Sequence, residues 1–364
     1  MYRIALIGLG LMGGSMGLAL REGDPTLEII GVDEPGVLDQ ALRKGAITKS
    51  ASSPNEAVAE ADIVILATPL SVTLGLIREI GPNLRPGTLV HDICSVKVPV
   101  ETCAQHALGD GVFFVGGHPM TGSEKAGIRH ADGLLFENAT YVLCPSSSSE
   151  ESEMYGELKR LLSSLGARLL EMESLVHDRI ASRVSHLPQL LSVLLVNLAS
   201  KSRKLDRNIL DLAAGGFRDM TRIAGSPFPM WHDILDGNRD EVLSALTDFE
   251  RLLAELKSDL ASKSLDSVGE RFRDAEQTRN FIPSDRKGFL QPLADVYVFT
   301  SDRPGALVDM TSALHEADLS IKDIELLRIR ENTGGTFRIG FETPIEADAA
   351  VRALSEANFL SYRL

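Results

Sequence analysis

Three glycines near the N-terminus have the spacing of a phosphate-binding turn. Gly8, Gly10 and Gly13 directly follow an apolar run at residues 4–7, and Asp33 closes the next apolar run. In this arrangement the first glycine permits a tight turn, the second lets a pyrophosphate approach the backbone, and the third allows close helix–strand packing. The carboxylate would bind ribose hydroxyls and repel a 2′-phosphate. The pattern predicts a dinucleotide site that favours NAD over NADP; the alternative is a glycine-rich turn without a ligand.

Later stretches carry side chains that could hold a substrate or move a proton: Ser95, Lys97, His118, His186 and Arg222. Ser95 and Lys97 offer donors to a substrate hydroxyl or a cofactor amide. Their alternative is a turn whose serine caps the following segment. A neutral histidine is the natural proton acceptor near pH 7, and a guanidinium can bind a carboxylate through two hydrogen bonds. Ser95, Lys97 and His118 follow expected strands, so we expect them near the reactive end of the cofactor.

The remaining expected cofactor contacts lie beyond a central strand. Residues 63–67 are continuously apolar, which is typical of a strand covered on both faces. Thr68 and Pro69 follow this run, at the end of the strand where the ribose or nicotinamide side of the cofactor would lie. The full set of expected cofactor contacts is Gly8, Gly10, Leu11, Met12, Gly13, Asp33, Thr68 and Pro69.

Alternating strand-like and helical patterns position these residues. The alternation runs through residues 1–172 and is typical of parallel α/β units. After the first two strands, we expect further strands at residues 62–68, 88–92, 113–117, 140–143 and 167–171. The pattern predicts a Rossmann-type α/β domain, with ligands bound beyond the carboxyl ends of its strands.

Amphipathic helical patterns replace the strands from residue 174 to 263, so we expect an all-α domain at residues 173–288. Residues 187–199 would be apolar on nearly every face of a helix. Such a helix lies either inside a bundle or between two subunits. We favour a subunit interface, because one small helical domain would struggle to cover this helix alone. The sequence therefore predicts dimerisation through this domain.

A polar connector at residues 285–292 leads to a third unit at residues 293–364. Its expected strands are 295–300, 321–330, 335–342 and 360–363, and its expected helices are 305–317 and 345–357. The resulting order βαββαβ predicts a ferredoxin-like sandwich.

Composition excludes several classes of protein. The net charge of −14 argues against nucleic acid as a partner, because phosphate binding needs a basic surface. Glycines interrupt the N-terminal apolar run, so we expect no signal peptide. The apolar stretch 187–199 is shorter than the ~20 residues that a membrane span needs. The cysteines Cys94, Cys103 and Cys144 are scattered, which favours the reducing cytoplasm and indicates no metal site.

The combination of motifs resembles the prephenate/arogenate dehydrogenase family of tyrosine biosynthesis, in the version with a C-terminal ACT domain. The resemblance covers essentially the whole chain. It is carried by residues 116–124 (GGHPMTGSE), 135–139 (LFENA), 185–188 (SHLP) and 216–222 (GFRDMTR), which are more specific than the glycine turn. Membership implies NAD-linked oxidative decarboxylation of prephenate to 4-hydroxyphenylpyruvate. The choice between prephenate and arogenate stays open, and full-length similarity to ACT-bearing relatives favours prephenate.

The resemblance implies roles for individual side chains. His118 would accept the substrate's hydroxyl proton with Ser95 beside it; the alternative for His118 is a structural histidine at a strand end. Arg222 would bind a substrate carboxylate, rather than only pair with Asp219, and Arg218 is the less favoured candidate for that role. The other implied substrate contacts are His186, Trp231, Glu124 and Lys97.

The last unit resembles an ACT domain in the stretch 302–307 (DRPGAL). Gly305 would let the backbone approach a small molecule, and the helix that follows would receive an amino-acid carboxylate. A second copy would add contacts from the region of Ile321 and Asp323. The resemblance implies feedback inhibition by L-tyrosine; the alternative is a domain that only dimerises. The expected effector contacts are Asp302, Pro304, Gly305, Ala306, Leu307, Ile321 and Asp323.

Two other functions fit parts of the sequence. A β-hydroxyacid dehydrogenase also joins a glycine-turn domain to a helical one, but Lys201 and Lys204 lack the accompanying asparagine spacing of its catalytic lysine. A non-catalytic sensor of NAD and an amino acid would need no proton acceptor, so His118 separates it from an enzyme.

Overall fold

The computed structural model describes residues 2–122, 125–150, 152–202, 207–281, 293–330 and 333–363. The chain divides into two compact units, Met1–Gln277 and Thr278–Leu364. The α/β part and the helical part therefore share the first unit, and the C-terminal sheet lies in the second. The predicted connector at residues 285–292 and the predicted substrate residue Glu124 lie outside the described residues.

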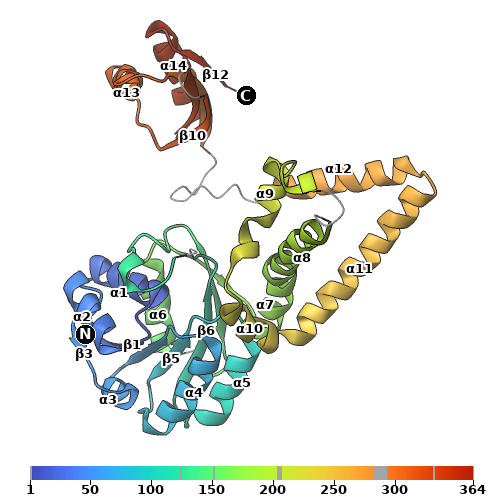
Figure 1. Cartoon of the computed structure of the whole chain (residues 1–364). Helices are drawn as coiled ribbons and strands as arrows, with labels where there is room; N and C mark the ends of the chain where they lie inside the picture. Colours follow the sequence, from blue (N-terminus) through green and yellow to red (C-terminus); the bar gives the residue numbers. More distant parts are fainter. Residues whose placement is uncertain are drawn as a thin grey trace. The chain divides into compact units, whose positions relative to one another are not determined.

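An eight-stranded sheet forms the α/β part, in the order β3-β2-β1-β4-β5-β6-β7-β8 (Figure 1). The order reverses between β1 and β4, which is where open α/β sheets bind ligands beyond the carboxyl ends of their strands. The bounds are β1 (Arg3–Ile7), β2 (Glu28–Val32), β3 (Lys49–Ser50), β4 (Ile63–Leu66), β5 (Leu89–Asp92), β6 (Phe113–Pro119), β7 (Thr140–Pro145) and β8 (Arg168–Glu171).

One edge of the sheet departs from the parallel arrangement of its other strands. Strands β1 to β6 are parallel, but β7 pairs with β6 in the antiparallel direction. A parallel return needs a crossover, usually a helix. In the described part of the β6–β7 connection, the only helical element is the single 3₁₀ turn η2 (Ile128–His130). The short strand β3 was also not predicted.

Two apolar cores cover the two faces of this sheet. The odd and even positions of β1 and β4 contribute to different cores: Leu6 and Ile65 pack with Leu20 on one face, and Val64 packs with Ile77 on the other. Every residue of β4 is buried, which confirms the prediction of a central strand. The flanking helices are α1 (Leu11–Gly23), α2 (Pro35–Lys44), α3 (Pro54–Val58), α4 (Leu70–Ile80), α5 (Val98–Ala107) and α6 (Glu153–Ser163), and the 3₁₀ turn η1 (Gly81–Asn83) follows α4.

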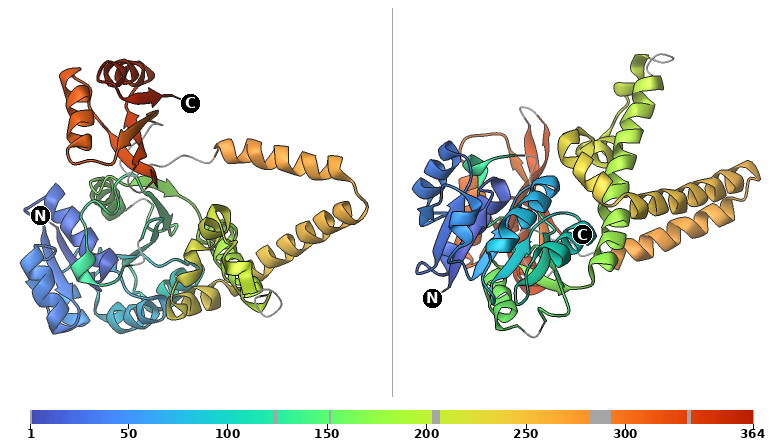
Figure 2. Two further views of the ribbon diagram at one scale, coloured as in Figure 1. Left: turned by 45° about the horizontal axis from the view of Figure 1, so that its top comes forward. Right: turned by 90° about the horizontal axis from the view of Figure 1, so that it is seen from below.

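Helices make up the rest of the first unit, as predicted. They are α7 (Ser174–Ala181), α8 (Leu187–Ser202), α9 (Gly215–Thr221), α10 (Phe228–Gly237), α11 (Arg239–Ala261) and α12 (Leu265–Phe281), with 3₁₀ turns η4 (Arg207–Leu210) and η5 (Arg222–Gly225). Figure 2 shows α11 and α12 as a helical hairpin. Arg271 of α12 pairs with Glu255 and Asp259 of α11, which links the two helices near the turn between them. Within the described residues, no helix has both the length and the apolar character needed to cross a membrane.

A π-helical turn, η3 (Ser182–His186), joins α7 to α8. In an uninterrupted α-helix, the nine residues from His177 to His186 would place these side chains about 180° apart. A π turn accommodates one extra residue, which reduces that angle to about 80°. Both histidines are buried. The turn therefore lets two histidines from opposite helical faces point into the same protein interior.

Helix α8 has an unusual distribution of polarity. Its buried residues are polar, Gln189 and Ser192. Several of its apolar side chains are exposed instead: Leu194, Val196 and Leu198, the last with 62% of its surface accessible. A helix normally turns its apolar stripe to the core. The outer face of α8 is therefore uncovered in a single chain.

The C-terminal unit has the predicted order βαββαβ (Figure 1). Its antiparallel sheet has the strand order β10-β11-β9-β12. Valines of β9 pack against α13 and α14, and a capping box between Thr343 and Glu346 starts α14. The elements are β9 (Ala294–Ser301), α13 (Ala306–Glu316), β10 (Asp323–Arg330), β11 (Gly334–Phe341), α14 (Pro344–Glu356) and β12 (Leu360–Tyr362).

Candidate active site

The glycine turn after β1 has the geometry that each of its glycines was expected to provide. Gly8 has φ +92°, which favours glycine. A Cβ on Gly13 would lie 1.9 Å from the Gly8 carbonyl oxygen, so α1 and β1 approach too closely for a side chain there. A Cβ on Gly10 would meet nothing within 4 Å. The structure therefore leaves open space at Gly10, where α1 begins, as the predicted pyrophosphate contact requires.

Asp33 lies beside this turn, at the end of β2. Its Oδ2 accepts the Leu9 N–H at 2.6 Å and its Oδ1 accepts the Glu34 N–H at 2.7 Å. These two bonds orient the carboxylate between the glycine turn and the start of α2. A fixed negative charge at this point suits a ribose with two free hydroxyls and disfavours a phosphorylated one.

A cavity of about 440 Å³ opens at the carboxyl ends of β1, β4 and β5. The predicted residues Met12, Thr68, Pro69 and Ser95 line it together. Helix α10 forms the opposite wall, and its Asp233 accepts the backbone N–H of Ser71 at 3.1 Å. The helical part of the unit therefore closes the edge of the sheet at the topological switch point.

His118 occupies the carboxyl end of β6 and is 9% exposed. Its Nδ1 lies 2.8 Å from Nε2 of His177, on α7. His177 in turn has its Nδ1 2.7 Å from Oδ1 of Asp178. Sequence reasoning did not identify His177 or Asp178. The available signal was a His-Asp pair at the start of the first helix after the α/β part, but nothing local linked it to His118.

Asp178 also fixes the loop after β5. Its Oδ1 accepts the Lys97 N–H at 2.8 Å and its Oδ2 accepts the Val98 N–H at 2.9 Å. Asp178 thus caps α5 from the helical part of the unit. Ser95 does not cap this helix, whose N-cap residue Lys97 makes no side-chain capping bond. Of the two alternatives for Ser95, the structure favours the cavity wall.

The surroundings of His118 keep its imidazole neutral. Burial is the main cause that lowers its pKa well below the ordinary value, and the charges of His177, Lys97 and His186 lower the pKa further. A neutral imidazole retains one unprotonated nitrogen. His118 is therefore able to accept a proton throughout the neutral pH range.

Lys97 does not have the position expected of a substrate contact. Its side chain is fully buried, and its Nζ donates to Asp92 Oδ2 at 2.5 Å and to the Gly117 carbonyl oxygen. Asp92 also accepts the Cys94 N–H at 2.8 Å. We correct the prediction accordingly: the ammonium ties the loop after β5 to the residue before His118.

Buried His186 and half-buried Trp231 form a second pair of rings. Their ring centroids lie 6.0 Å apart in an edge-to-face arrangement. Nδ1 of His186 lies 3.3 Å from the Asn238 amide nitrogen, and burial lowers the pKa of His186 to about 4. Among the described residues, neither Nε2 of His186 nor Nε1 of Trp231 has a hydrogen-bond partner. Two buried polar nitrogens of this kind provide places for ligand oxygens.

The two arginines of the stretch 216–222, Arg218 and Arg222, have different surroundings in the structure. Arg222 starts η5, and this turn is held on α8 because Gln189 donates to the Ile223 carbonyl oxygen at 2.9 Å. Arg218 instead donates from Nε to the Ala213 carbonyl oxygen at 3.2 Å. The contact of Arg218 with its own segment agrees with its lower rank as a carboxylate ligand.

The C-terminal unit has a cavity of its own, about 400 Å³ in volume. Among the predicted effector residues, Asp302, Gly305, Ala306 and Leu307 line it. Gly305 has φ +86° and precedes α13. The other predicted contacts do not all lie there: Ile321 packs against the core of the unit, and Asp323 accepts from Arg338 at 2.9 Å.

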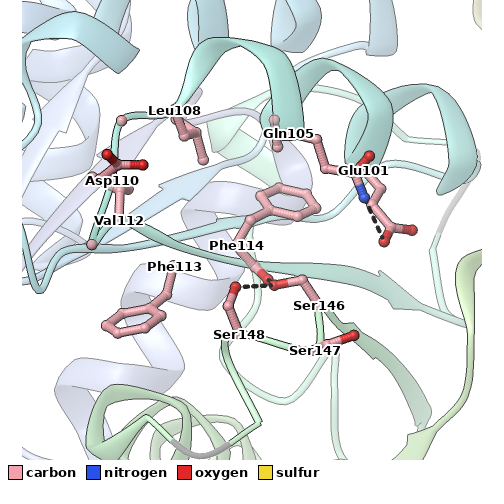
Figure 3. A pocket seen from close by; sticks show the side chains of 13 residues that line it. Glu101, Gln105, Leu108, Asp110, Val112, Phe113, Phe114, Ser146, Ser147 and Ser148 are labelled. Atoms are coloured by element: carbon pink, nitrogen blue, oxygen red, sulfur yellow. Dashed lines mark hydrogen bonds between the residues drawn. The ribbon is translucent and has the colours of Figure 1, made fainter.

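A further hollow of about 590 Å³ lies at the opposite end of β6 (Figure 3). Phe113, Phe114, Gln105 and the serines of the β7–α6 loop line it. Five residues at about 3.3 Å each separate Phe113 from His118, so this hollow is distant from the buried imidazoles. The predicted residues Met12, Thr68, Pro69 and Ser95 line the cavity at the carboxyl edge instead.

The glycine turn, the carboxylate after β2 and a buried proton acceptor define a dinucleotide-dependent dehydrogenase with a helical second part. Comparison with known families identifies which dehydrogenase family the chain belongs to. Residues 16–171 match the nucleotide-binding domain of prephenate dehydrogenase, and residues 173–274 match the dimerization domain of prephenate dehydrogenase. The chain belongs to the prephenate dehydrogenase family.

Individual relatives agree with this assignment. The chain is 36% identical to the prephenate dehydrogenase of Bacillus subtilis over 93% of this chain and 92% of the relative. It is 34% identical to that of Lactococcus lactis over 98% of both chains. The crystal structure of Aquifex aeolicus prephenate dehydrogenase with hydroxyphenyl propionate and NAD+ superposes with a TM-score of 0.71 at 28% identity, over 78% of this chain and 99% of that one.

Proposed function

We propose that the chain oxidises prephenate with NAD+ and releases CO2 and 4-hydroxyphenylpyruvate. The observation that carries this proposal is His118, a buried and neutral imidazole at the end of β6 in a family that acts on prephenate. The reaction needs an acceptor for the hydroxyl proton at the carbon that loses its hydride. NAD+, when bound, accepts that hydride.

Other residues of the chain would bind the cofactor and transfer the hydroxyl proton. The backbone at Gly10 and the start of α1 hold the pyrophosphate, and Asp33 holds the ribose. Ser95 and Thr68 line the cavity that would receive the nicotinamide end. His118 takes the hydroxyl proton as the hydride leaves, and it returns the proton to the same oxygen once CO2 departs and the ring becomes aromatic.

Prephenate has two carboxylates, and the helical part offers groups that suit them. Arg222 is our candidate for one carboxylate, since a guanidinium binds carboxylates through two hydrogen bonds. The open nitrogens of His186 and Trp231 suit a second oxygen-bearing group. Glu124, which lies outside the described residues, is retained as a substrate contact on the resemblance alone.

One assay tests the proposed activity. NADH formation would be measured with prephenate and with arogenate, each with NAD+ and with NADP+. We expect turnover with prephenate and NAD+. Turnover with arogenate only would establish the other member of the family, and turnover with neither substrate would refute the proposal.

Asp33 is expected to set the preference for NAD+. In Asp33→Ala, we expect the ratio of kcat/KM for NAD+ over NADP+ to fall about tenfold or more, because the repulsion of the 2′-phosphate is removed along with the carboxylate. Steady-state rates with both cofactors measure this ratio. Equal use of both cofactors by the unmodified enzyme would contradict the role assigned to Asp33.

We also propose that the enzyme is a homodimer through its helical part. The matched dimerization domain and the exposed apolar face of α8 support this assembly. Leu194 and Leu198 lie on that face, and the hairpin of α11 and α12 exposes Leu252 and Phe272. Apolar surface of this extent is typical of a site covered by a partner.

We propose further that the C-terminal unit is an ACT domain that binds L-tyrosine. Its strand order and the cavity at Gly305 support this proposal. Added tyrosine is then expected to lower the rate of prephenate turnover or raise the half-saturating prephenate concentration. The control is Gly305→Val, which strains a positive φ at the cavity and should weaken the response while activity without tyrosine persists. An unchanged rate at millimolar tyrosine would leave only the dimerisation alternative.

A further inference from the structure

Two successive hydrogen bonds connect His118 to His177 and His177 to the Asp178 carboxylate. The carboxylate fixes which nitrogen of each imidazole carries its proton. Asp178 can only accept hydrogen bonds when ionised, so its Oδ1 receives the Nδ1–H of His177 at 2.7 Å. With the ring proton of His177 on Nδ1, its Nε2 is the nitrogen that accepts. His118 must therefore donate its own Nδ1–H across the 2.8 Å contact. This order of donors leaves the lone pair of His118 on Nε2.

The carboxylate that sets this order is itself immobilised. Backbone N–H groups of Lys97 and Val98 hold both oxygens of Asp178, at 2.8 and 2.9 Å. His177 and Asp178 are both buried on α7. The dyad thus has a fixed geometry and is shielded from water.

We propose that His177 and Asp178 form a proton relay behind His118, in which His177 holds a proton during the reaction. This inference rests on the proposed oxidation of prephenate. The substrate hydroxyl proton binds Nε2 of His118 while the hydride passes to NAD+. The Nδ1 proton of His118 moves to Nε2 of His177, which becomes an imidazolium paired with the Asp178 carboxylate. When CO2 leaves, both proton movements reverse and the aromatic oxygen recovers its proton. The step neither consumes nor releases a net proton.

The charges around the two imidazoles favour this direction of transfer. Burial is the main cause that disfavours a positive charge on His118, and the neighbouring His177 and the Lys97 ammonium disfavour it further. The Asp92 carboxylate is already paired with Lys97. His177, by contrast, lies in direct contact with Asp178. A positive charge is therefore better stabilised on His177, beside the Asp178 carboxylate, than on His118.

The experiment replaces His177 by glutamine. An amide can still accept the hydrogen bond of His118, but it cannot hold the transferred proton. In the His177→Gln holoenzyme we expect kcat to fall by about 10²-fold, with KM for prephenate and NAD+ changed by less than about twofold. The decisive readout is the rate of single-turnover hydride transfer in mixtures of H2O and D2O. We expect a curved dependence on deuterium content for the unmodified enzyme, from two moving protons, and a linear one for the variant.

His91→Gln provides a matched control. Like His177, His91 is buried, but it lies on β5. It contacts Tyr141 and the Val115 carbonyl oxygen instead of His118. Its variant should retain the curved dependence. If His177→Gln does not fold, Asp178→Asn tests the same relay through the loss of the carboxylate. A curved dependence in the folded His177→Gln or Asp178→Asn enzyme would overturn the relay. An unmodified enzyme without prephenate turnover would instead overturn the proposed function.

Discussion

Replacement of His118 by asparagine is expected to lower kcat for prephenate by about 10²- to 10⁴-fold, the usual contribution of a general base. Asparagine retains a polar side chain but has no nitrogen that can accept a proton near pH 7. Stopped-flow or steady-state NADH formation measures the loss. NAD+ affinity should change little, because the glycine turn and Asp33 lie on other strands.

The pH dependence of the unmodified enzyme provides a companion test. His118 must be neutral to accept a proton, and burial lowers its pKa. The activity is therefore expected to stay level as the pH falls through the ordinary range of histidine, and to decrease only at more acidic pH. Normal turnover by the His118→Asn enzyme would refute the role of His118 as the proton acceptor.

Lys97→Met is expected to destabilise the first unit by about 3–5 kcal/mol. The substitution removes one partner of a fully buried ion pair and leaves the Asp92 carboxylate uncompensated. It also removes the donor to the Gly117 carbonyl oxygen, directly before His118. The free energy of unfolding in urea or guanidinium measures the effect.

Two further variants separate the buried charge from a general effect of lysine loss. Lys49 pairs with Glu28 on the surface, so Lys49→Met should cost about 1 kcal/mol or less. In the double variant Lys97→Met, Asp92→Asn, no charge remains buried at this site, so much of the lost stability should return. An equal loss in Lys97→Met and Lys49→Met would contradict the structural role of Lys97.

Features that depend on local sequence could be predicted. The glycine turn, Asp33 and the buried strand β4 each follow from a short pattern of glycines, apolar residues and one acid. The order of elements in the C-terminal unit follows from the same alternation. His118 could be singled out because it follows a strand in an α/β pattern, where such sheets bind ligands.

Features that depend on contacts between distant segments could not be predicted. His118 and His177 are 59 positions apart, and only the folded helical part brings them together. The burial of Lys97 gives no local signal, because lysine is normally exposed. The reversed direction of β7 depends on the path of its connection across the sheet. The assignment of Lys97 to the substrate was wrong for this reason.

The extra residue in η3 controls more than the direction of one histidine. Every side chain from Leu187 onward inherits its angular position from this turn. Deletion of a single residue there would rotate α8 by about 100° relative to α7. Its exposed leucines would then turn away from the surface proposed for the second subunit, and Gln189 would lose its place below η5. A change in length by one residue would thus alter both quaternary assembly and the floor of the substrate site, although it removes no residue from either.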